Sequence, residues 1–159
     1  MGKVLSSFNN GFVGAASRSI DNVIISMKNG AGGEIPFGAP VFMVAGENTC
    51  DTFDENSADT AFLGFAVRVP DKTPEVYGSS EAAFQVGDPV EVLVRGSVVL
   101  PFDGSAAPGA SVYIRKADGK LVTSAGASGS TLLLPNVKVR TGADSAGRAE
   151  VVVLRRNLM

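Results

Sequence analysis

Residues 89–100 read PVEVLVRGSVVL, two valine-rich runs joined by Arg95, Gly96 and Ser97. Valine favours strands because its branched side chain packs well on a pleated surface. A glycine between two such runs predicts a β-bulge or a sharp bend in the chain. Short apolar runs punctuated by Gly and Pro recur throughout the sequence, so the whole chain is expected to be built from β-strands.

The composition limits the chemistry that this chain can perform. It has 159 residues, of which 19 are Gly and 45% are hydrophobic, with no His, no Trp and one Cys. Because His and Cys carry much acid-base, thiolate and metal-binding chemistry, we expect no enzyme activity, no cofactor and no metal. The net charge of −2 argues against nucleic-acid binding, which needs a basic face. No apolar run approaches the roughly 18 residues that cross a bilayer, so no membrane partner is expected.

The first 19 residues differ in character from the rest of the chain. They are rich in Ser, Asn, Gly and Ala, and the large apolar residues Leu5, Phe12 and Val13 are too scattered to form a strand. Such a segment cannot bury enough apolar surface to order itself. We therefore expect an extended N-terminal arm over residues 1–19, mobile in the free protein, and a single β domain over residues 20–159.

Alternating apolar residues and turn residues mark the strands of this domain. Val23, Ile25 and Met27 share one face with a period of two, and Asn29-Gly30 supplies a turn. Residues 46–59 are expected to form a polar, acidic loop. About eight to ten short strands with regular turns predict an all-β fold, either a small β-barrel or a jelly-roll-like sandwich. The other expected strands cover residues 41–44, 61–69, 90–94, 98–100, 112–115, 120–123, 137–140 and 149–154, the last being apolar on both faces and therefore central.

Motifs for catalysis or metal binding do not emerge from the sequence. The acidic loop places Asp51, Asp54 and Glu55 close together, but it lacks the central Gly and the terminal Glu of a calcium-binding EF-hand loop. A solvated loop is the expected interpretation. There is no phosphate-binding glycine motif and no Gly-x-Ser-x-Gly elbow. No catalytic, cofactor-binding or metal-ligating residue is predicted.

Several aromatic and basic residues are candidates for contact with a partner protein. Phe53 and Phe102 lie in loop contexts, where exposed aromatic side chains can anchor an interface, although packing against the core is the favoured alternative. Arg155 and Arg156 are adjacent near the C-terminus, where the alternative is a solvated tail. With two residues of the arm, the contact candidates are Phe12, Arg18, Phe53, Phe102, Arg155 and Arg156.

Five segments, taken in order, resemble one known family, the structural cement or head-decoration proteins of tailed bacteriophages. The resemblance covers most of residues 11–115 and ends before Leu121. It implies a β-barrel or jelly-roll-like body on the outside of an icosahedral capsid, without catalytic residues, and an arm that wraps across subunit boundaries. The segments are Gly11 to Ile25, Ile35-Pro-Phe-Gly-Ala-Pro-Val41, Phe62-Leu-Gly-Phe-Ala-Val-Arg68, Gly87-Asp-Pro-Val90 and Val94-Arg-Gly-Ser-Val98.

The resemblance implies a capsid cement protein, made in the bacterial host cytoplasm, that binds the outer surface of the head and clamps neighbouring major capsid subunits. Its expected partners are the major capsid protein and further copies of itself, as a dimer or trimer. Two alternatives stay open. One is another all-β virion component, such as a tail-tube, baseplate or head-fibre protein. The other is a carbohydrate-binding β-sandwich, which usually needs Trp or Tyr platforms, and only Tyr77 and Tyr113 are present.

Overall fold

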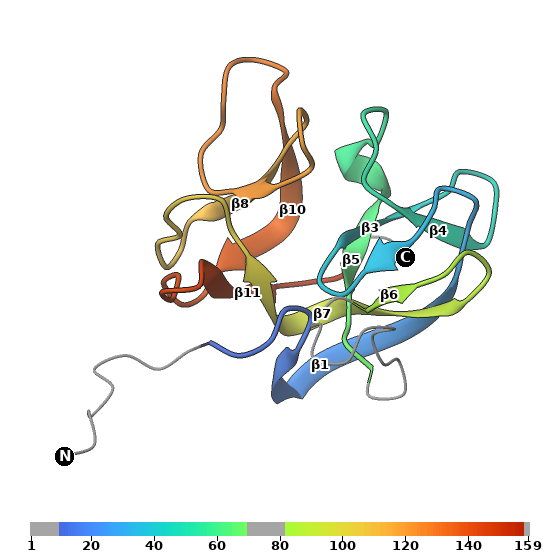
Figure 1. Cartoon of the computed structure of the whole chain (residues 1–159), viewed down its shortest axis with the longest axis horizontal. Coiled ribbons are helices and arrows are strands. Elements are labelled where there is room, and N and C mark those ends of the chain that lie inside the picture. The colour runs from blue at the N-terminus through green and yellow to red at the C-terminus, as the bar shows by residue number, and fades with distance from the viewer. Residues whose placement is uncertain (1–9, 70–81, 158–159) are drawn as a thin grey trace.

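The computed structural model describes residues 10–69 and 82–157, and it is built from strands (Figure 1). Within these ranges the only helical element is one short 3-10 turn, η1, so the expected all-β fold is confirmed. No helix among them is long and apolar enough to span a membrane. The elements are β1 Ala16–Asn29, β2 Ile35–Pro36, β3 Pro40–Met43, β4 Thr49–Thr52, η1 Asp59–Ala61, β5 Phe62–Ala66, β6 Ala83–Phe84, β7 Pro89–Pro101, β8 Ser111–Arg115, β9 Leu121–Val122, β10 Thr131–Val139 and β11 Arg148–Val153.

Five strands close into a barrel. β1 pairs with β4 in parallel and with β7 in antiparallel orientation, while β3 joins β4 to β5, and β5 pairs with β7. Val23, Ile25 and Met27 pack toward the core of this barrel, as their alternation predicted. The two-stranded sheet of β2 and β6 adds Ile35 and Phe84 to the same core.

The remaining strands form a C-terminal lobe on the other side of β7 (Figure 1). β11 lies between β7 and β10, and β8 and β9 follow β10 in the sheet order. The central position expected for the last strand is therefore confirmed. The Asp118-Gly119 turn joins β8 to β9 as an antiparallel hairpin, as its sequence predicted. The backbone N–H of Asp103, just after β7, donates to the carbonyl of Leu121 in β9 at 2.9 Å, so the lobe also curls toward closure.

β7 serves both lobes because its two faces cover two separate cores. Val92 and Val94 point into the barrel core, whereas Leu93 and Val98 point into the core of the C-terminal lobe. β5 is divided in the same way, with every one of its residues buried. A strand that is buried on both faces must be apolar without alternation. This explains why the runs Val92-Leu-Val94 and Val98-Val-Leu100 are apolar without alternation.

Gly96 bends β7 where it passes from one lobe to the other. Its φ is +116°, a conformation that side-chain-bearing residues rarely adopt. A Cβ atom at this position would lie 2.0 Å from Oδ1 of Asn22, and that oxygen accepts a hydrogen bond from the N–H of Ser97 at 3.1 Å. The pairing of β1 with β7 is irregular on both sides of Asn22. The bulge or bend that the sequence predicted at Gly96 is confirmed.

One strand lies where the sequence predicted only a loop. β4 falls within residues 46–59 and pairs with both β3 and β1. Its Cys50 is fully buried in the barrel core, while the carboxylate of Asp51 accepts a hydrogen bond from the N–H of Gly32. Four residues with three polar side chains carry too little apolar periodicity to reveal a strand. The hydrogen bonds to β3 and β1 therefore stabilise these residues as a strand, although their own sequence does not favour one.

The chain joins the body earlier than the sequence indicated. β1 begins at Ala16 rather than near Ile20, and residues 10–15, which we call the strap, are hydrogen-bonded to both lobes. Asn10 reaches the carbonyls of Gly142 and Arg148 in the C-terminal lobe at 3.0 and 2.7 Å. Residues 1–9 lie outside the described residues, so the N-terminal arm as a separate unit stays a prediction.

Gly14 attaches the other end of the strap to the body through backbone hydrogen bonds. Its N–H donates to the carbonyl of Val99 in β7 at 2.9 Å, and its carbonyl accepts from the N–H of Arg68 beyond β5 at 2.8 Å. A Cβ atom here would lie 2.9 Å from the backbone N of Gly38, so only glycine permits this close approach. The sequence did not reveal this attachment, because the hydrogen bonds of the strap come from backbone groups and the Asn10 side chain, which leave no pattern of apolar residues.

A buried carboxylate fastens β1 to the C-terminal lobe. Glu150 of β11 has a side chain that is 7% exposed, and it accepts hydrogen bonds from Arg18 at 2.7 Å and from Ser17 at 2.8 Å. Burial raises the pKa of Glu150, but these hydrogen bonds outweigh it, so the pKa lies below the ordinary value for glutamate. The ionised form is therefore the form that the fold stabilises.

The stability of the protein is expected to fall in acid because of this group. A carboxyl group with a lowered folded pKa stabilises the fold above its unfolded pKa, about 4.3, and loses that contribution as the pH falls through the folded pKa. Asp144, whose pKa is lowered chiefly by the hydrogen bond from the Asn10 N–H, acts in the same direction. Scanning calorimetry between pH 7 and pH 3 should show Tm constant down to about pH 5 and then decreasing. Glu150→Gln should lower Tm at pH 7 and make the decrease of Tm below pH 5 less steep. If Tm depended on pH in this variant as it does in the natural protein, other groups would cause the acid sensitivity.

Candidate functional site

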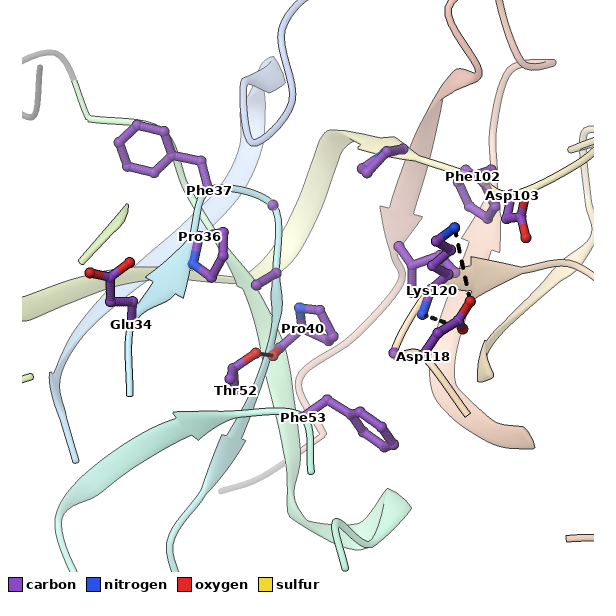
Figure 2. Close-up of a pocket in the computed structure, with 15 residues that line it drawn as sticks. Glu34, Pro36, Phe37, Pro40, Thr52, Phe53, Phe102, Asp103, Asp118 and Lys120 are labelled. Carbon is purple, nitrogen blue, oxygen red and sulfur yellow. Dashed lines mark hydrogen bonds and ion pairs between the residues drawn. The ribbon is translucent and has the colours of Figure 1, made fainter. Parts of the chain in front are cut away.

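A groove of about 620 Å³ separates the barrel from the C-terminal lobe (Figure 2). One wall comes from the barrel, where Pro36, Phe37 and Pro40 lie around β2 and β3 and Phe53 follows β4. The other wall comes from the C-terminal lobe, with Phe102 after β7 and the β8–β9 hairpin. We call this feature the interlobe groove. Its walls are mostly apolar, so it suits apolar side chains of another protein more than a polar small molecule.

The shape of the groove is fixed by rigid and well-packed residues. Pro36, Pro40 and Pro101 lie on its walls, and proline has a fixed φ that leaves little freedom to lose on binding. Phe53 packs against Phe42 of the core with ring centroids 6.1 Å apart. At the turn of the β8–β9 hairpin, Gly119 approaches Phe53 so closely that a Cβ atom there would lie 3.6 Å from its ring. The two lobes therefore meet at one end of the groove.

Charged side chains line the rim on the side of the C-terminal lobe. Arg115 pairs with Asp103 at 2.6 Å and also with Asp118, and Lys120 lies 3.9 Å from Asp118. The hydrogen bond from Arg115 lowers the pKa of Asp118 to about 2. Figure 2 shows Glu34 on the opposite wall, away from this network. The rim is thus polar and charged around an apolar interior, the usual arrangement of a protein-binding surface.

Two of the six contact candidates line the interlobe groove. Phe53 and Phe102 both line the interlobe groove, but Phe102 is 8% exposed and belongs to the core of the C-terminal lobe. Phe12 on the strap is 62% exposed, and the guanidinium of Arg68 lies over its ring, 5.4 Å from the ring centroid, and also over the ring of Phe37 at 5.3 Å. Cation–π stacking of this kind holds the exposed ring in place.

The three basic candidates lie elsewhere on the surface. Arg18 is tied to Glu150, as described above. Arg155 donates a hydrogen bond to Oδ1 of Asn136 at 3.0 Å, and Arg156 is exposed. Whether any of the six touches a partner stays a prediction. The sequence missed Pro36, Phe37 and Pro101, although prolines at strand ends were a visible signal for a rigid edge.

The described residues hold no arrangement that suggests catalysis. Among them, no three side chains of the Cys, Asp and Glu type are grouped to hold a metal ion. The carboxylate of Asp54 instead accepts hydrogen bonds from the N–H of Asn56 and the hydroxyl of Ser57 within its own turn. Burial, with a smaller contribution from the charge of Asp51, raises the pKa of Cys50 to about 11. This thiol therefore stays protonated near neutral pH and is a poor nucleophile.

Comparison with known proteins identifies the family. A family model described as "Structural cement protein (E217 gp24/Pam3 gp6)" matches residues 3–155. A chain from the solved structure "The capsid of Myoviridae Phage XM1" superimposes with a TM-score of 0.71 at 20% identity, covering 97% of this chain and 96% of that chain. No curated protein matches the sequence. The family model extends through the C-terminal lobe, where the sequence resemblance had ended at Leu121. Because the match spans nearly the whole chain, this protein belongs to the structural cement protein family.

Proposed function

We propose that this protein is a capsid cement protein of a tailed bacteriophage, which binds the outer surface of the head and joins neighbouring major capsid subunits. The observation that carries the proposal is the family match over residues 3–155, which includes both lobes. The similarity to a chain of a phage capsid structure supports the fold. No catalytic step is part of the proposed function, which agrees with a sequence without His and with a protonated, buried Cys50.

The proposed mechanism is thermodynamic linkage. A protein that binds only the assembled shell stabilises assembly by the free energy of that binding. The body described here suits a clamp because the barrel and the C-terminal lobe share β7 and are tied again by the strap. Because the two lobes are held together, a force on one capsid subunit is transmitted through the clamp to the next. We propose that the arm before the strap adds a further contact with the shell.

The interlobe groove is the proposed contact with the major capsid protein. Its occupant would be an apolar segment of a capsid subunit, because the walls are apolar and the charged groups of the C-terminal rim are already paired with one another. Phe53 is the candidate anchor, since it is partly exposed and comes from a loop rather than from a strand. Aromatic anchors in such grooves commonly contribute most of the binding energy.

Particles without this protein are expected to rupture at a lower temperature than complete particles. The test compares stripped particles, particles re-decorated with the natural protein, and particles re-decorated with Phe53→Ala, by following DNA release on heating. We expect the natural protein to restore the rupture temperature. Phe53→Ala should bind about 30-fold more weakly, which corresponds to about 2 kcal/mol for one lost anchor.

The matched control is Val86→Ala, which truncates an apolar side chain that is 57% exposed and does not line the groove. It should bind like the natural protein. A particle reconstruction completes the test by locating the chain. Density in the tail, or inside the shell, would contradict the proposal and favour another virion component. Equal rupture temperatures for stripped and complete particles would show decoration without clamping.

A further inference from the structure

β1 carries a wide bulge where it crosses the bend of β7. Arg18 pairs with Ser97 and Val23 pairs with Arg95, so residues 19–22 of β1 lie opposite a single residue of β7. The surplus residues cannot all fit into the ladder and must arch out of the sheet. Ile20, which is one of them, is fully exposed. Because bulges redirect side chains and are frequent beside binding sites, this bulge is a candidate contact surface.

A hollow of about 480 Å³ lies beside the bulge. Ile20 and Asn22 line it from β1, Ser97 lines it from β7, and Arg140 and Val152 line it from the end of β10 and from β11. It shares no lining residue with the interlobe groove. We call this feature the bulge hollow. The protein therefore has a second concave surface, built where β1 meets the C-terminal lobe.

Positive charge exceeds negative charge around the bulge hollow. Two ion pairs neutralise most of the charged side chains there, namely Arg18 with Glu150 and Arg95 with Asp21. Arg140 remains, and in the described part of the chain its guanidinium forms no ion pair. The charge of Glu150 also acts on Arg140, but the carboxylate is already hydrogen-bonded by Arg18 and Ser17. One cation is thus in excess at this surface, on a chain whose net charge is −2.

Ser97 holds the Arg140 guanidinium in place. Arg140 donates to Oγ of Ser97 at 3.0 Å, and Ser97 is 1% exposed, so this acceptor is fixed within the sheet. Arg140 itself is exposed. A guanidinium has several N–H donors in a planar fork that matches the two oxygens of a carboxylate. Arg140 is therefore a positioned donor that keeps N–H groups for a partner.

We propose that the bulge hollow binds an acidic segment of a major capsid subunit. An Asp or Glu carboxylate of that segment would bind Arg140, and a neighbouring apolar side chain would pack on Ile20 and Val152. A run of DNA phosphates would be repelled by Glu150 and Asp21, whereas a single carboxylate needs only the one cation in excess. Charge complementarity therefore favours a protein segment as the occupant.

This inference rests on the proposed function, because the occupant is a subunit of the shell. A clamp that joins neighbouring subunits needs at least two contact surfaces, one for each subunit. The interlobe groove supplies one of them, and the bulge hollow, which has separate lining residues, supplies the other. Two weak contacts on one rigid body also bind together more tightly than either binds alone.

Co-sedimentation of the full-length chain with stripped heads, over a range of protein concentrations, tests the apolar part of the contact. Ile20→Ser should raise Kd about fivefold, and Tm should stay unchanged because the side chain is fully exposed. The matched control is Val86→Ser, which alters another exposed apolar side chain that lines neither the hollow nor the groove. The control should bind like the natural protein.

The same measurement at several salt concentrations tests the charged part of the contact. Arg140→Gln should raise Kd about tenfold and make binding less sensitive to salt, because one ion pair across the contact is lost. Arg140→Lys keeps the charge without the fork and should recover part of the affinity. Lys28→Gln, which removes an exposed charge near the other end of β1, should change neither quantity. If the lost bond to Ser97 lowers the Tm of Arg140→Gln, Ile20→Ser still decides the outcome.

The outcomes separate this inference from the proposed function. Head binding that stays unchanged in Ile20→Ser or in Arg140→Gln would overturn the inference, while loss of binding in Phe53→Ala would still support the proposed function. A natural protein that does not bind heads would contradict both. Fluorescence anisotropy with a short DNA duplex completes the test. Duplex binding that Arg140→Gln abolishes would make nucleic acid the occupant and overturn the inference, as would a variant that changes the sedimentation coefficient of the free protein.

Discussion

Replacing Gly64 with alanine is expected to lower the Tm by more than about 10 °C. Gly64 lies on β5 in the wall between the two cores, and a Cβ atom there would lie 2.0 Å from the carbonyl oxygen of Leu93 on β7. That overlap involves backbone, so no side-chain rotation relieves it, and β5 must separate from β7. The cost is expected to exceed about 4 kcal/mol, and each kcal/mol lowers Tm by roughly 2–4 °C in a domain of this size.

The matched control for this experiment is Gly142→Ala. The nearest atom to a Cβ at this position is the carbonyl oxygen of Ala106 at 3.7 Å, and the backbone does not adopt a left-handed conformation. Alanine there should leave Tm unchanged or slightly raised, because it restricts the unfolded chain. Differential scanning fluorimetry of the two variants provides the comparison. If Gly64→Ala melted at the same temperature as Gly142→Ala, β5 and β7 would not approach each other as closely at this position as the structure shows.

Removing residues 1–15 is expected to lower Tm by about 10 °C. The deletion removes the hydrogen bonds of Asn10 to the C-terminal lobe and those of Gly14 to Val99 and Arg68. It also removes the Phe12 ring from Arg68. Each of these hydrogen bonds contributes about 1 kcal/mol net, which together amounts to about 3–5 kcal/mol. The loss should appear as a lower denaturant midpoint as well as a lower Tm.

Two further variants locate the effect within the N-terminal segment. Deletion of residues 1–9 leaves the strap intact, and the expected separate arm predicts a Tm within about 2 °C of the natural protein. Asn10→Ala keeps the chain length but removes the side-chain bonds to Gly142 and Arg148, and should cost about 1–2 kcal/mol. If the deletions of residues 1–9 and 1–15 were equally destabilising, the important contacts would precede Asn10.

The stability of β7 and of the strap affects the proposed binding site, the interlobe groove. Its two walls belong to different lobes, and their separation is set by β7 and by the strap. Phe37, on the barrel wall, is also stacked on Arg68 and thereby on the strap residue Phe12. A variant that loosens the strap should therefore weaken particle binding more than its loss of stability alone would predict. The groove is a property of the assembled fold and not of a local motif.

Part of the contact site could be predicted from the sequence. Phe53 and Phe102 were selected because aromatic residues in loops often meet partners, and both line the groove. Phe102 is nevertheless buried, because Gly147 accepts its backbone N–H and the closing C-terminal lobe covers its ring. Loop context in a sequence cannot distinguish a covered aromatic ring from an exposed one. That distinction depends on where the neighbouring hairpin folds.

The sequence by itself determined the β class, the turn at Asp118-Gly119, the bend at Gly96 and the central position of the last strand. These features are local, because side-chain alternation, β-branching and glycine conformation act over a few residues. Only the tertiary structure decided that β7 divides two cores, that β4 is a strand, and that the strap joins both lobes. Each of these depends on contacts between residues far apart in the chain, and no local pattern specifies which distant partner a strand edge, a polar segment or a charge will meet.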